Sequence, residues 1–71
     1  MNLDAILDRI HAAHPGLARL ELATGTDGRT MQLKFRRSDP FRQSTVTVCA
    51  NTSGMSDNEI AAWAISEIKS A

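Results

Sequence analysis

The chain has 71 residues, of which 42% are hydrophobic, and its formal net charge at pH 7 is zero. This length predicts a single domain, residues 1–71, with a thin stability margin, because a chain of about 60 residues buries only about 60% of its unfolded surface. The apolar content argues against disorder, and no apolar run approaches the roughly 20 residues that span a bilayer.

The cysteine and histidine content limits the chemistry that we expect. Cys49 is the only cysteine, so it forms no disulfide within the chain. His11, His14 and Cys49 lack the paired spacing of zinc ligands, so we expect no metal and no cofactor. Acids interrupt residues 1–15, so we expect no secretory signal and a cytoplasmic location with a free thiol. A domain this small that has neither disulfides nor a metal often gains stability from a partner chain, so a homodimer is one hypothesis.

The first element is predicted to be a helix that ends before Pro15. Its apolar residues recur at i, i+3, i+4 and i+7 and form one stripe: Leu3, Ile6, Leu7 and Ile10. Asn2 can cap the first turn, where Asp4 suits the positive end of the helix dipole. Pro15 disfavours helical geometry at the residue before it, which sets the end.

From Leu17 onward the apolar period changes to two, which predicts three strands. The residues expected on the apolar face are Ala18, Leu20 and Leu22, then Met31, Leu33 and Phe35, then Val46, Val48 and Ala50. Asp27-Gly28 supplies the positive φ of a tight turn, and residues 38–40 give a second turn signal. Short loops between half-buried strands indicate an antiparallel meander.

The last element is predicted to be a helix that starts with a capping box. Ser56 and Glu59 can each satisfy an orphan amide, and Met55 can pack on Ile60 as a hydrophobic staple. The apolar stripe is formed by Ile60, Ala61, Ala64, Ile65 and Ile68. Trp63 lies off this stripe, on the opposite flank.

The predicted fold class is α+β with the order α-β-β-β-α, and both helices pack on one face of a three-stranded antiparallel sheet. This order resembles the topology of the double-stranded RNA-binding domain. That family begins its last helix with a lysine-rich S-K-K-x-A-K motif that holds phosphates, whereas this chain has Ser56-Asp57-Asn58-Glu59 at that place. The topology is therefore expected without the motif, and duplex binding of that kind is not expected.

The central hairpin concentrates the positive charge. Residues 29–42 hold five basic residues and one acid, whereas the rest of the chain holds three basic residues and seven acids. A polarised surface of this kind steers encounters with a charged partner. Three hypotheses remain: a solvated sheet edge, an acidic face of a partner protein, or nucleic acid. The candidate partner-binding residues are Lys34, Arg36, Arg37, Arg42, Phe41 and Trp63.

Trp63 is the strongest single indication of a contact surface, because tryptophan is enriched at interface hot spots and is costly to leave exposed. The sequence leaves three explanations for what covers it: the chain's own loops, including Phe41 or Met31, a second copy of the chain, or a different protein.

No catalytic constellation is found. Asp8 and His11 are neighbours on one helix face, but they lack a nucleophile, an oxyanion donor and a pocket. We therefore expect a small non-enzymatic protein-binding module, in the class of phage or mobile-element inhibitors and accessory factors that dock on a larger host assembly. The alternatives are a nucleic-acid-binding module that uses the arginine hairpin and the open sheet face, and a homo-oligomeric structural subunit.

Overall fold

The computed structural model describes residues 1–41 and 43–71. Its elements follow in the order α1 (Leu3–Ala13), β1 (Leu17–Thr24), β2 (Thr30–Arg37), β3 (Val46–Asn51) and α2 (Asp57–Ser70). The predicted order of helix, three strands and helix is confirmed. The part of the chain that is described has no helix with the length and apolar content needed to cross a bilayer.

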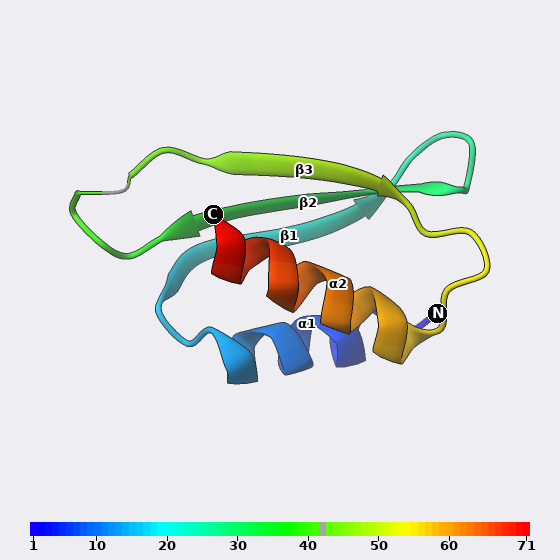
Figure 1. Ribbon diagram of the computed structural model, residues 1–71, viewed down its shortest axis with the longest axis horizontal. Helices are drawn as coiled ribbons and strands as arrows, with labels where there is room; N and C mark the ends of the chain where they lie inside the picture. The colour runs from blue at the N-terminus through cyan, green and yellow to red at the C-terminus, as the bar shows by residue number, and fades with distance from the viewer. Residues whose placement is uncertain (42) are drawn as a thin grey trace.

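The three strands form one antiparallel sheet with β2 in the centre. Figure 1 shows α1 and α2 side by side on one side of this sheet, with the other side uncovered. The predicted placement of both helices on one sheet face is therefore confirmed. The uncovered side is called the open face below.

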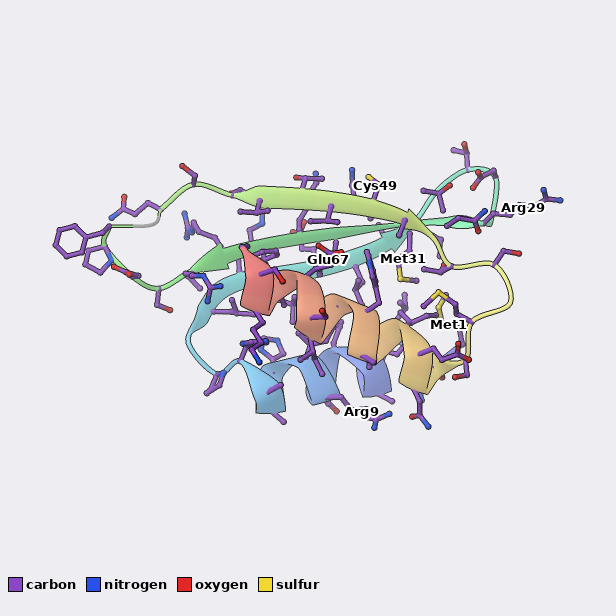
Figure 2. All side chains as sticks on the ribbon, viewed as in Figure 1. Met1, Arg9, Arg29, Met31, Cys49 and Glu67 are labelled. Atoms are coloured by element: carbon purple, nitrogen blue, oxygen red, sulfur yellow. The ribbon has the colours of Figure 1, made fainter. Side chains whose placement is uncertain are left out.

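The core lies between the helices and the sheet. Its fully buried side chains come from both helices and from the central strand: Ile6, Ile10, Met31, Leu33, Phe35, Ile60, Ala61, Ala64 and Ile68. Figure 2 shows Met31 pointing from β2 toward the helices. The central strand supplies the fully buried residues of the sheet. The flanking strands contribute only half-buried side chains, such as Leu20 and Val48.

Both helices begin with the caps that the sequence predicts. The Asn2 side chain accepts a hydrogen bond from the N–H of Ala5 at 3.1 Å. In α2 the Ser56 hydroxyl accepts from the N–H of Glu59, and the Glu59 carboxylate accepts from the N–H of Ser56, each at 3.2 Å. The reciprocal pair fixes where α2 starts and so sets which of its residues face the sheet.

The rotation of α2 places its two flanks over different neighbours. The flank that carries Asn58 and Ile65 faces α1, because Arg9 donates to the Asn58 side chain and the His14 ring lies 3.1 Å from the carbonyl oxygen of Ile65. At about 100° per residue, Trp63 lies on the other flank. Since α1 packs against β1, that other flank lies toward β3.

The start of β1 departs from the predicted alternation. The pairing with β2 shifts register between Leu17 and Arg19, so Ala18 is an extra residue in a bulge. Ala18 is exposed and Leu17 packs against the core, which reverses the prediction that Ala18 faces inward. A bulge places two residues opposite one on the partner strand, and a strict period of two cannot anticipate it.

The two connecting loops differ in length. The β1–β2 loop is closed by Gly25 and Thr30, whose N–H and carbonyl groups hydrogen-bond at 2.6 Å, and Gly28 has a φ of +70°, as the turn requires. The β2–β3 connection runs over residues 38–45 and is longer than the short turn expected from Ser38-Asp39-Pro40. It projects beyond the end of the sheet in Figure 1.

Candidate binding surface

The open face carries a basic row near the projecting end of the sheet. Arg36 on β2 lies opposite Arg19 on β1, and Lys34 lies between Glu21 on β1 and Thr47 on β3. Arg19 forms an ion pair with Glu21 at 2.9 Å. Arg36 is exposed, and within the described residues its side chain has no hydrogen bond or ion pair, so its charge is available to a ligand.

Arg37 points to the other side of the sheet from Arg36. Its guanidinium donates to the carbonyl oxygen of Ile68 and, at 3.2 Å, to that of Ala71. These carbonyls lie at the end of α2, where a cation also suits the negative end of the helix dipole. Arg37 therefore fastens the end of α2 to the central strand, a role that the sequence did not suggest.

Phe41 stands on the β2–β3 loop with 93% of its surface exposed. The loop is held locally by Asp39, whose carboxylate accepts a hydrogen bond from the N–H of Phe41 at 2.9 Å. Beside Phe41 is a hollow of about 310 Å³, whose lining comes from three parts of the chain: Phe35, Arg37, Phe41, Ser44, Val46 and Ala71. An exposed phenylalanine next to a hollow is a typical anchor for a partner.

Two further hollows lie at the same end of the molecule. One of about 350 Å³ is lined by residues of the α1–β1 connection together with Arg37 and Asp39. The other, of about 250 Å³, is lined by Ala18, Arg36, Arg37, Ser38 and Gln43. Because Arg37 borders all three hollows, this end forms a concave surface around it. This surface, which consists of residues 36–41 and the three hollows beside them, is called the loop end below.

Trp63 does not belong to the loop end. It is half-buried and packs against the core from the α2 flank that lies toward β3. Phe41 is almost fully exposed, so it does not cover Trp63. Met31 belongs to the buried core against which Trp63 packs. The chain's own core thus covers part of the Trp63 side chain, and the rest is exposed to solvent.

The six candidate residues therefore fall into separate places. At the loop end Arg37 lines one hollow with Phe41 and another with Arg36, Lys34 lies further along the open face, and Trp63 lies on the helix side. Arg42 lies outside the described residues. The sequence-based list missed Arg19, although strand alternation already placed it on the open face. Its position opposite Arg36 depends on the register, which the bulge at Ala18 sets.

Asp8 and His11, which we considered as a catalytic pair, are exposed on α1. Within residues 1–41 and 43–71, His, Cys, Asp and Glu form no cluster of three that could hold a metal ion. Cys49 is exposed on the open face, and Figure 2 shows it pointing away from the helices.

Comparison of the chain with protein-family models, with curated proteins and with solved structures gives no match. Any function has to be inferred from the surface itself.

Proposed function

We propose that this chain is a non-enzymatic protein-binding module whose contact surface is the loop end, and that it acts as an inhibitor or accessory factor by stoichiometric docking. The observation that carries the proposal is Phe41, which is 93% exposed on a projecting loop beside a hollow. A large apolar side chain costs free energy when it is held in water, and burial against a partner recovers about 1.5–3 kcal/mol.

The chemistry of the loop end indicates what the partner presents. Phe35 and Val46 line the hollow beside Phe41, so an apolar side chain of the partner fits there. Arg36 lies on the other side of the same strand end, where its guanidinium can bind a carboxylate in a bidentate pair. The partner is therefore a protein face that combines an apolar projection with acidic residues.

Capture of the partner tests this proposal. The tagged protein, with Phe41→Ser and Arg36→Glu as separate variants, is used to capture proteins from a lysate of the source cells. Arg29→Glu is the matched charge control, because Arg29 lies in the loop at the opposite end of the sheet (Figure 2). We expect a stoichiometric protein with the unaltered chain and the control, and its loss from both loop-end variants. Unchanged capture by folded Phe41→Ser and Arg36→Glu would refute the proposal.

A second candidate function is supported by the basic row of the open face, where Lys34, Arg36 and Arg19 could contact phosphates. Single-stranded nucleic acid usually needs aromatic side chains on which bases stack, and the described strands offer none on this face. Titration with labelled single-stranded and duplex nucleic acid over a salt series separates the two candidates. Binding that weakens steeply with salt and disappears in Arg36→Glu would favour nucleic acid.

A further inference from the structure

The two edges of the sheet are unlike. The β1 edge carries the bulge at Ala18 and the charged pair Arg19 and Glu21. The β3 edge, Val46–Asn51, has no charged residue, proline or glycine, and it pairs with β2 without a register shift. Folded proteins protect sheet edges with bulges, charges and prolines, which stop another strand from adding. β1 has such protection, and β3 has none.

The direction of the β3 peptide groups follows from one hydrogen bond. The N–H of Thr52 donates to the carbonyl oxygen of Arg29 at 2.9 Å, just beyond the strand. In an antiparallel ladder these groups alternate, so Val48 and Ala50 bond to β2. Thr47, Cys49 and Asn51 then direct their N–H and carbonyl groups away from the sheet, which leaves a regular row of donors and acceptors along the edge.

The side chains beside this edge are also suited to contact. Val46 and Val48 are half-buried on the helix side, and Trp63, which is also half-buried, is on the flank of α2 that lies toward β3. On the open face the edge presents the small uncharged side chains Thr47 and Cys49. A strand that continues this sheet must be apolar on one face and small and polar on the other.

We propose that β3 pairs antiparallel with β3 of a second copy of this chain, which joins two sheets into one of six strands. A second copy supplies the required alternation on both faces, brings no charge to the seam, and places its own Trp63 flank against the first. The pairing is two-fold and self-complementary, so each copy uses the same edge. Because the β1 edges are protected, assembly stops at the dimer.

The register follows from parity and from the apolar residues of β3. Two directly opposed residues of neighbouring strands point to the same side of the sheet. In a pairing of β3 with itself, the two-fold axis therefore lies between the two copies of one residue. An axis at Val48 pairs residues 46–50 of the two copies, and an axis at Cys49 pairs residues 47–51, but only the first keeps the apolar residues Val46, Val48 and Ala50 opposite one another. We therefore place Val48 opposite Val48 of the partner subunit, and Thr47 opposite Cys49 of the partner subunit.

Solution mass and hydrogen exchange test the dimer. We expect twice the chain mass of 7.7 kDa at high concentration, with slow exchange at the outward amides of Thr47 and Cys49. The outward amides of Leu20 and Leu22 on β1 are the internal control and should exchange fast. A monomeric mass at all concentrations, or equally fast exchange on both edges, would overturn the proposal.

Proline variants provide the matched control. Thr47→Pro removes an outward N–H of β3 without removing a bond to β2, and edge strands tolerate proline at such positions. Thr24→Pro makes the same change at an outward position on β1. With folding verified by circular dichroism, we expect a monomer for Thr47→Pro and a dimer for Thr24→Pro. A dimer that survives Thr47→Pro would exclude β3 as the seam.

Disulfide trapping tests the register. Opposed residues of a hydrogen-bonded pair have Cα atoms about 5.5 Å apart, within the range that a disulfide spans. Thr47→Cys should therefore cross-link to Cys49 of the partner subunit under mild oxidation. The unaltered chain should cross-link slowly, because its two Cys49 residues are diagonal neighbours about 7–8 Å apart. Rapid trapping of the unaltered chain would place the axis at Cys49 instead.

Discussion

Arg36 and Arg37 are adjacent in the sequence but act on opposite sides of the sheet. Arg37 donates to the carbonyl oxygens of Ile68 and Ala71, whereas Arg36 projects from the open face. We predict that Arg37→Gln lowers the free energy of unfolding by about 1–2 kcal/mol, because the end of α2 loses a charged donor. Arg36→Gln is the control and should change it by less than about 0.5 kcal/mol. Urea unfolding measures both, and equal effects would contradict the role of Arg37.

Asp27 makes the β1–β2 loop sensitive to acid. Its carboxylate accepts from the N–H of Arg29 at 2.9 Å and from the N–H and the hydroxyl of Thr30, each at 3.0 Å. The hydrogen bond from the N–H of Arg29, followed by those from Thr30, lowers the pKa of Asp27 below its usual 3.8. Because the folded pKa is the lower one, this stabilisation is present above pH 3.8 and is lost as the pH falls through the lowered value.

Asp27→Asn tests this contribution. The amide does not ionise over this range, so the variant should lose less thermal stability than the unaltered chain between neutral pH and a pH well below 3.8. Thermal unfolding followed by circular dichroism at the two pH values gives the comparison. The same acid sensitivity in both proteins would show that other carboxylates control it.

At the scale of the element, α2 depends on its capping box. Ser56→Ala removes the acceptor for the N–H of Glu59 and should destabilise the protein by about 1 kcal/mol. Ser66→Ala makes the same chemical change at an exposed position inside the helix, where alanine is the better helix former, so it should be neutral or slightly stabilising. Chemical denaturation of both variants measures the difference. A similar loss in both would contradict the cap.

Most of the elements could be predicted because each signal is local. The capping residues, the period of 3.6 and the period of two all lie within one element, and these are the features that the structure confirms. The bulge at Ala18 could not be predicted, because it depends on how β1 registers against β2. The length of the loop over residues 38–45 was missed for a related reason, since a turn signal marks where a strand ends but not where the next begins.

At the scale of the whole molecule, the candidate site was only partly predictable. The sequence located positive charge on one hairpin, but it could not separate Arg36 from Arg37, because the side of a strand end depends on packing. It predicted Trp63 as a candidate interface residue, and the structure shows this side chain half-buried against the core, outside the hollow that Phe41 lines. The molecule therefore has two distinct candidate contact surfaces, the loop end for a different protein and the β3 edge for a second copy.

The measurement that tests the central claim most directly is photo-cross-linking at Phe41 in the source cells. Phe41 is replaced by the photoreactive analogue p-benzoylphenylalanine, which keeps the aromatic ring, and Ala12 on the exposed side of α1 is replaced in the same way as the control. The account predicts one protein adduct of defined mass from position 41 and none from position 12. No adduct from the folded protein at position 41, or the same adduct from both positions, would contradict it.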